Sequence, residues 1–187
     1  IQKAFEATGV SANGAEGFRL HDGLFEHCVA AGNRYGFYLP ASGLAAGSVA
    51  TKCGVWGFYA DDLSDPQLMV NNVAAFNTNG FYLGDGSLIA ACLAYTNQNR
   101  GIQLDFARAD ECLIVANKIG LLAGAATRLD QNTVCDNVTG IQWTGRSNIV
   151  VRNVLSGNAT NWATVPGSLT AFTTHTTNKW PWINYVY

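Results

Sequence analysis

The residues of this chain best suited to chemistry are carboxylates that follow short apolar and aromatic runs. Asp61, Asp62 and Asp85 each lie four or five residues after a glycine that begins such a run. If these side chains lie close together, repulsion would raise the pKa of one carboxyl, and the set could divide into the general acid and general base of a glycosidase. The same oxygens could instead accept hydrogen bonds from sugar hydroxyls. Aspartate is also common in turns, where it bonds its own backbone, so a purely structural role stays open.

Tyrosines recur at a fixed position beside these acids. Tyr38, Tyr59 and Tyr82 each stand two residues after a glycine. A tyrosine presents a flat apolar ring and a hydroxyl, which together suit the C–H faces and hydroxyls of sugars. The candidate ligand-binding set combines them with polar residues at or near the same position: Arg19, Tyr38, Tyr59, Tyr82, Gln103 and Asp105. The alternative is that stacked tyrosines only stabilise a sheet through same-face pairing.

The histidines show no metal-ligand spacing, because His21, His27 and His175 belong to no compact group in the sequence. We therefore predict no cofactor and no firm metal site. Ca²⁺ bound through the oxygens of Asp62 and Asp85 is the one metal that the acids leave open.

The elements that position these residues belong to an internal repeat with a period of about 20 residues. Each repeat has a small polar residue, an Asn five positions later in nearly every case, and then a glycine that begins an apolar run. The first polar positions are Thr8, Cys28, Ser48, Asn72, Cys92, Cys112, Asn132 and Asn153. The glycines are Gly17, Gly36, Gly57, Gly80, Gly101, Gly120 and Gly140, with Trp162 in the eighth repeat. Such a glycine indicates positive φ or close backbone approach.

The repeat predicts three short strands per turn of a parallel β-helix, with turns stacked at about 4.8 Å. Identical Asn side chains would then form ladders in which each amide bonds the next. We predict almost no helix, because no segment of ten or more residues sustains a 3.6-residue apolar period. Period-two alternation points the phenylalanines after the glycines inward, among them Phe37, Phe58 and Phe81.

A second core column is expected four residues before the first polar position. It contains Leu24, Leu44, Leu68, Leu88 and Ile149, interrupted by Arg108 and Arg128. We interpret the two arginine turns as shifted in register or bulged outward, since an unpaired buried charge is very costly.

Cysteines take repeat positions that Asn or Ser occupy elsewhere, which indicates small, mostly buried side chains. Cys92 and Cys112 would lie on neighbouring turns, so a disulfide between them is geometrically conceivable. The odd total of five cysteines argues against a disulfide framework.

The pattern apolar-x-x-x-(Asn/Cys)-Val-x-x-x-x-Asn-x-x-Gly-(Ile/Phe)-x-Leu resembles the repeat of the pectate-lyase superfamily. It is clearest from Ile149 to Asn158 and covers roughly residues 5–162. The resemblance implies an all-β, right-handed, single-stranded parallel β-helix of about eight turns, with a saccharide groove on the sheet that follows the glycines. Members include polysaccharide lyases, glycoside hydrolases, epimerases, tailspikes and adhesins, so the fold does not fix the function.

Departures from the enzymes of that superfamily leave catalysis uncertain. The Gly-His-Gly and Arg-Ile-Lys motifs of polygalacturonase-like hydrolases are absent from the sequence. The pair Asp61–Asp62 is the one feature that resembles the paired aspartates of those enzymes. Lyase-like members use an arginine as base, but no motif selects Arg19, Arg34 or Arg100 for that role.

Composition excludes two classes of partner. The net charge is −2, 13% of residues are charged, and the sequence contains no basic run, so nucleic acid binding is not expected. The sequence contains no apolar stretch of about 18 residues, so no membrane-spanning helix is expected.

We divide the chain into a β-helix over residues 1–162 and a C-terminal capping segment over residues 163–187, whose Trp180, Trp182, Tyr185 and Tyr187 should pack on the solenoid. The chain begins with Ile and without a signal peptide, which we interpret as processing or as a fragment of a secreted or cell-surface protein. Homo-oligomers or end-to-end self-association are conceivable partners.

The leading functional hypothesis is a module that binds a polysaccharide along the tyrosines. The alternatives are a polysaccharide lyase or glycoside hydrolase that uses the nearby acids, and a structural solenoid without a ligand.

Overall fold

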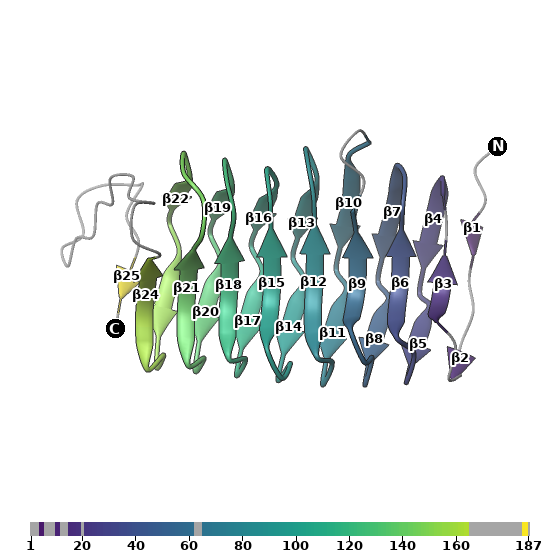
Figure 1. Ribbon diagram of the computed structural model, residues 1–187, viewed down its shortest axis with the longest axis horizontal. Coiled ribbons are helices and arrows are strands. Elements are labelled where there is room, and N and C mark those ends of the chain that lie inside the picture. The colour runs from purple at the N-terminus through teal and green to yellow at the C-terminus, as the bar shows by residue number, and fades with distance from the viewer. Residues whose placement is uncertain are drawn as a thin grey trace.

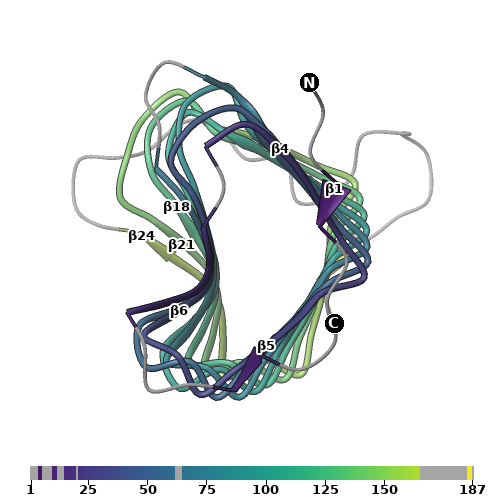
Figure 2. The ribbon, with the colours of Figure 1, turned by 90° about the vertical axis from the view of Figure 1, so that its right-hand side faces the viewer.

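Twenty-five short strands wind into a solenoid whose described residues contain no helix. This computed structural model describes residues 4–5, 10–11, 15–19, 21–61, 65–164 and 185–186. Each turn places one strand on each of three parallel sheets, so strands three apart in the sequence lie side by side (Figure 1). The view along the axis shows the sheets as three walls around the core (Figure 2). The predicted parallel β-helix is therefore confirmed.

The sheets are named here A, B and C. Sheet A contains β1 (Ala4–Phe5), β4 (Gly23–Glu26), β7 (Gly43–Ala46), β10 (Gln67–Val70), β13 (Leu88–Ala90), β16 (Arg108–Asp110), β19 (Arg128–Asp130) and β22 (Ile149–Val151). Sheet B contains β2 (Val10–Ser11), β5 (Val29–Ala31), β8 (Val49–Thr51), β11 (Val73–Ala75), β14 (Leu93–Tyr95), β17 (Leu113–Val115), β20 (Thr133–Cys135), β23 (Val154–Ser156) and β25 (Tyr185–Val186). Sheet C contains β3 (Glu16–Arg19), β6 (Tyr35–Leu39), β9 (Trp56–Ala60), β12 (Asn79–Leu83), β15 (Arg100–Leu104), β18 (Ile119–Ala123), β21 (Thr139–Trp143) and β24 (Thr160–Thr164).

The predicted phenylalanine column fills the core behind sheet C. Phe37, Phe58 and Phe81 pair in register and are fully buried. Their rings stack with centroids 4.6 and 4.9 Å apart, which is close to the spacing of the turns. The same side chain on three successive turns therefore stacks at the spacing that the backbone hydrogen bonds of the sheet impose.

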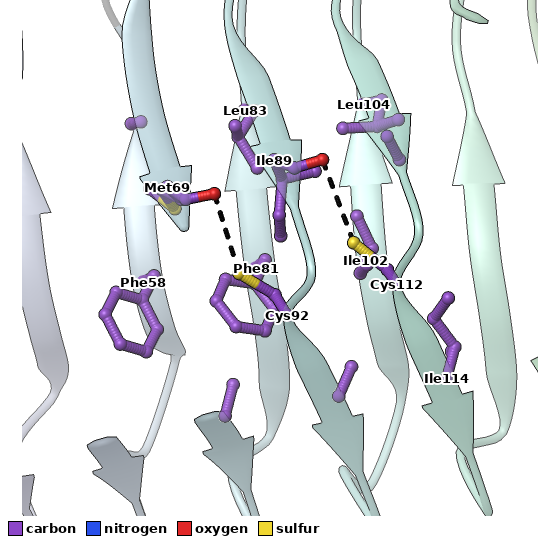
Figure 3. Close-up of a cluster of buried hydrophobic side chains, with 14 of the residues drawn as sticks. Phe58, Met69, Phe81, Leu83, Ile89, Cys92, Ile102, Leu104, Cys112 and Ile114 are labelled. Carbon is purple, nitrogen blue, oxygen red and sulfur yellow. Dashed lines mark hydrogen bonds between the residues drawn. The ribbon is translucent and has the colours of Figure 1, made fainter. Parts of the chain in front are cut away.

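The predicted leucine column on sheet A is wrong by one residue. Leu68 is 36% exposed and Ile149 is 50% exposed, whereas the next residue along β10, Met69, is fully buried. Met69 and Ile89 pack into the core beside Phe58 and Phe81 (Figure 3). The corner residue explains the error: Asn71, just before the polar position, has φ 56° and interrupts the two-residue alternation between strand and corner.

The arginine turns are neither shifted nor bulged, because the whole column faces outward. Arg108 pairs in register with Leu88, and Arg128 pairs with Arg108. On the outside of sheet A, Arg128 Nη2 lies 2.9 Å and Arg152 Nη2 lies 2.6 Å from Asp130 Oδ2. The carboxylate of Asp130 is 1% exposed, so its charge is compensated by two guanidinium groups at the surface.

This arrangement predicts a pH dependence of stability. Hydrogen bonds from Arg152, and secondarily from Arg128, hold the pKa of Asp130 below its ordinary value despite burial. The resulting stability is present above the unfolded-state pKa of about 3.9 and is lost as the pH falls through the lower folded pKa. We therefore expect the destabilisation caused by Asp130→Asn to shrink below about pH 4, in urea unfolding measured over a pH series. The exposed carboxylate of Asp136 supplies the control Asp136→Asn, and an equal pH dependence of both variants would contradict the prediction.

Polar ladders connect the turns at the corners. Between sheets B and C, the backbone N–H of Asn97 donates to Asn117 Oδ1 at 2.9 Å, and that of Asn117 donates to Asn137 Oδ1 at 2.8 Å. The ladder continues through Cys53, Asn77, Asn97, Asn117, Asn137 and Asn158. These bonds satisfy polar groups that the solenoid buries at every turn.

The five cysteines are all free thiols. Cys92 and Cys112 stand in the polar ladder between sheets A and B, where the backbone N–H of Asn72 donates to Cys92 Sγ and that of Cys112 donates to Asn132. Their thiols donate to backbone carbonyls, including that of Met69 from Cys92 and that of Ile89 from Cys112 (Figure 3). They therefore act as small ladder residues, and the conceivable Cys92–Cys112 disulfide is not formed.

The glycine column on sheet C reflects close approach, since none of these seven glycines has positive φ. A Cβ on Gly101 would lie 2.7 Å from the carbonyl oxygen of Gly120. The eighth repeat shifts this pattern by one residue: Trp162 pairs with Ile141, and its ring stacks on Trp143 with centroids 6.2 Å apart.

The C-terminal boundary at residue 162 falls inside β24, which continues to Thr164, and β25 pairs in parallel with β23. Residues 165–184, which contain most of the predicted capping segment, lie outside the described residues, so the cap stays a prediction. The described part of the chain has no helix long and apolar enough to cross a membrane.

Candidate functional site

The predicted tyrosine column lies on the outer face of sheet C. Tyr38, Tyr59 and Tyr82 pair in register on β6, β9 and β12. Adjacent ring centroids are 5.6 Å apart between Tyr38 and Tyr59, and 5.0 Å apart between Tyr59 and Tyr82. The side chains are half-buried rather than fully exposed, because further aromatic residues pack beside them.

A second column beside the tyrosines was missed by the sequence analysis. Tyr35 lies with its ring centroid 6.0 Å from that of Tyr38 and 5.3 Å from that of Tyr59. Trp56 lies 6.1 Å from Tyr59 and 5.6 Å from Tyr82. The residue just before each glycine thus shares the outer face with the residue two positions after it.

The backbone of sheet C explains this arrangement, because its strands bend inward in the view along the axis (Figure 2). Strict alternation would have placed Tyr35 and Tyr38 on opposite faces. The sequence does contain a pattern that could have indicated this second column, because an aromatic residue precedes both Gly36 and Gly57. We call the five contiguous rings the aromatic face: Tyr35, Tyr38, Trp56, Tyr59 and Tyr82.

Guanidinium groups extend the aromatic face at the end nearer the N-terminus. Arg19 lies over the Tyr38 ring at 4.9 Å and contacts Glu16 at 3.4 Å. Arg34 lies over the Tyr35 ring at 5.4 Å from its centroid. Such cation–π contacts hold the guanidinium groups against the rings and place hydrogen-bond donors beside them.

Beyond the tyrosines, β15 carries the other predicted polar residues. Arg100 Nη1 donates to Gln103 Oε1 at 2.8 Å, and Gln103 pairs in register with Tyr82. Arg100 also occupies the position of Trp56 and Asn79 in the missed column. The outer face of sheet C therefore changes from aromatic to polar along the solenoid.

Three of the predicted acids border the aromatic face where the strands of sheet C end. We call Asp61, Asp85 and Asp105 the acidic edge. Tyr59 Oη donates to Asp61 Oδ2 at 2.7 Å. Burial first, and then the charges of Asp105, Asp61 and Asp85, raise the pKa of the Tyr82 phenol. All three carboxylates therefore act on one tyrosine, although they come from three turns.

The acidic edge also perturbs its own members. Burial and, more weakly, the charge of Asp85 raise the pKa of Asp105, against hydrogen bonds from the Ala125 backbone and Gln103. Burial and the hydrogen bond to Asp61 raise the pKa of Tyr59. Asp62, the third predicted catalytic acid and one half of the predicted Ca²⁺ pair, lies outside the described residues.

The geometry suits recognition of an extended ligand with flat apolar faces and hydroxyls. Rings about 5 Å apart on successive turns form a continuous platform. Carboxylates on one side accept hydrogen bonds, and the guanidinium groups and the Gln103 amide donate them. No three His, Cys, Asp or Glu side chains gather as a metal site in the part of the chain that the structure describes.

Comparison with known proteins places this geometry in context. A family model described as "Periplasmic copper-binding protein (NosD)" matches residues 6–187. A crystal structure of the periplasmic alginate epimerase AlgG, a T265N T268M double mutant, matches with a TM-score of 0.50 and 12% identity. The match covers 89% of this chain and 49% of the epimerase chain, so this chain spans about half the length of that protein. No curated protein sequence matches this chain.

The description of the matched family raises the question of copper. Copper is held by thiolates, thioethers and imidazoles. The carbonyls of Ala90 and Asp110 are alternative acceptors for the single hydrogens of the buried Cys92 and Cys112 thiols. The described histidines, His21 and His27, join no metal-binding group. The described residues therefore do not fit a copper centre.

Proposed function

The chain belongs to the NosD family, and from this membership and the geometry of sheet C we propose that it is a β-helix module, located outside the cytoplasm, that binds a polysaccharide along the aromatic face. The observation that carries the proposal is the contiguous group of five rings, in which each ring centroid lies 5.0–6.1 Å from a neighbour. The four tyrosines are half-buried and offer the contact surface, and Trp56, which is 7% exposed, packs against Tyr59 and Tyr82. The word "periplasmic" in the family description supports a secreted or cell-surface location.

A polymer suits this surface better than a small molecule. The platform repeats with the turns, so its binding groups recur along the solenoid axis every 4.8 Å or so. A chain of sugar rings that lies along this axis contacts several tyrosines at once, and each contact adds stacking and hydrogen bonding. Tyr38, Tyr59 and Tyr82 are the binding residues, with Arg19, Gln103 and Asp105 as polar neighbours.

The central tyrosine provides the direct test. We expect Tyr59→Ala to weaken polysaccharide binding at least about tenfold, because Tyr59 contacts four other rings at the centre of the face, where hot spots concentrate. Affinity electrophoresis against neutral and acidic polysaccharides, with and without Ca²⁺, measures this. Circular dichroism checks that the variant remains folded.

Two variants separate binding from stability. Tyr95, which is 41% exposed on sheet B, supplies the control Tyr95→Ala, expected to bind like the wild type. Tyr59→Phe keeps the ring and loses the hydroxyl that donates to Asp61, so it should retain most of the stacking contribution. If the folded wild type bound no polymer, the binding proposal would fail and a structural solenoid would remain.

The pKa of Asp105 supports an enzymatic alternative. A carboxyl whose pKa is raised by burial and a neighbouring carboxylate can serve as a general acid, as in glycoside hydrolysis. In this alternative Asp61, Asp62 and Asp85 supply the other carboxylates of a lyase or glycosidase. Release of new chain ends from a bound polymer, abolished in Asp105→Asn, would support it, whereas binding without cleavage would leave the module as a binder.

A further inference from the structure

The carboxylates of the acidic edge lie along the side of the aromatic face at which the strands of sheet C end. Asp61 accepts a hydrogen bond from Tyr59 and follows β9 directly. Asp85 and Asp105 follow β12 and β15, on the next two turns. The charges of all three raise the pKa of the Tyr82 phenol, which agrees with their placement on successive turns at this edge. A ligand that covers Tyr59 and Tyr82 therefore passes beside three carboxylates.

The cations of the same face are placed differently. Arg19 and Arg34 stack on Tyr38 and Tyr35, at the end of the platform nearer the N-terminus, and Arg19 is also paired with Glu16. Arg100 donates to Gln103 from the beginning of β15, on the turn after Tyr82. The guanidinium groups therefore lie at the beginnings of strands and on the turns that flank the platform, whereas the carboxylates line the side of the platform at which the strands end.

We propose that the acidic edge makes the aromatic face selective for uncharged polysaccharides and excludes polyanions, an inference that rests on the proposed polysaccharide-binding function. A polyuronate carries a carboxylate on every ring, so it cannot cover Tyr59 and Tyr82 without bringing like charges together in a partly buried place. A neutral polymer brings hydroxyl groups to the same place, and these donate to the carboxylates. Asp61, Asp85 and Asp105 are thus specificity determinants.

A matched pair of polymers tests the charge alone. Soluble β-glucan, mannan and amylose are the neutral probes, and alginate and polygalacturonate are the anionic ones. A neutral polymer that binds is then oxidised at its primary alcohols to carboxylates, which adds charge to the same backbone. We expect the oxidised form to bind about tenfold more weakly or worse, and the difference to narrow at high salt.

Neutralised variants assign the effect to the acidic edge. The triple variant Asp61→Asn, Asp85→Asn and Asp105→Asn should bind the oxidised polymer more tightly than the wild type does. The control is Asp136→Asn, which removes an exposed carboxylate from the corner between sheets B and C and should not tighten binding. The single variant Asp85→Asn should shift in the same direction if the triple variant folds poorly. Equal or tighter binding of the oxidised polymer or of alginate by the wild type would overturn the selectivity and leave polysaccharide binding intact. Failure of every polymer to bind would overturn both.

Discussion

Asn117→Ala is expected to lower the free energy of unfolding by about 3–5 kcal/mol. The side chain is 3% exposed and stands in the middle of the ladder between sheets B and C. Its Oδ1 accepts from the backbone N–H and the Nδ2 of Asn97, at 2.9 and 3.0 Å. Its Nδ2 donates to the carbonyls of Ala94 and Val115 and to Asn137 Oδ1. Truncation therefore leaves buried donors and acceptors on three turns without partners.

Urea unfolding followed by circular dichroism measures this loss. Gln98→Ala, at an exposed position just after the ladder residue of the preceding turn, should change the free energy of unfolding by less than about 0.5 kcal/mol. Asn117→Cys is informative, because Cys53 already occupies this ladder and its backbone N–H still donates to Asn77. We expect the free energy of unfolding of Asn117→Cys to lie between those of Asn117→Ala and the wild type. A loss for Asn117→Ala as small as that of Gln98→Ala would show that water replaces the ladder bonds.

Gly101→Ala should be nearly as damaging, with a loss of about 3 kcal/mol from overpacking. The new Cβ would lie 2.7 Å from the carbonyl oxygen of Gly120, 2.7 Å from Ile114 Cγ2 and 2.9 Å from Asn117 Nδ2. The first of these atoms belongs to the backbone of the next turn, and the third belongs to the ladder. Relief of the clash therefore requires the turns to separate, which weakens the bonds between them.

Gly54→Ala is the matched control, because a Cβ there meets nothing closer than 3.9 Å and the residue is exposed. It should be neutral or slightly stabilising, since alanine reduces the freedom of the unfolded chain. The same urea titration compares the two variants. Equal urea midpoints for the two variants would mean that glycine recurs at this position of the repeat for a reason other than close backbone approach.

Much of the fold was predictable because the repeat is a one-dimensional signal. The polar positions, the Asn ladder and Phe37, Phe58 and Phe81 were all found from spacing alone, since stacking in register places equal residues above one another. The error on sheet A arose where local geometry departs from a regular strand. A corner residue with positive φ, such as Asn71 or Ala91, changes the phase of the alternation between inward and outward side chains. Alanine rarely adopts positive φ, so the residue type of Ala91 does not predict this corner.

The candidate site was only partly predictable for a related reason. Tyr38, Tyr59 and Tyr82 were found because a column of equal residues is visible in the sequence. Tyr35 and Trp56 were missed because they share the face only through the bend of sheet C, which a period of two does not contain. The grouping of the acidic edge around Tyr82 depends on how each strand ends, and this too required coordinates.

The ladder between sheets B and C has a direction. Each backbone N–H of the ladder residues from Asn77 to Asn137 donates to the side-chain oxygen of the following turn, so each of these side-chain oxygens accepts from the turn before. Removal of a turn from the C-terminal side therefore leaves backbone N–H donors unpaired. Removal of one from the N-terminal side leaves a side-chain oxygen unpaired, and it also takes away the backbone carbonyl to which the side-chain Nδ2 donates. The ladder is therefore polarised: its C-terminal end must supply acceptors for backbone N–H groups, whereas its N-terminal end must supply a donor for a side-chain oxygen and an acceptor for a side-chain N–H.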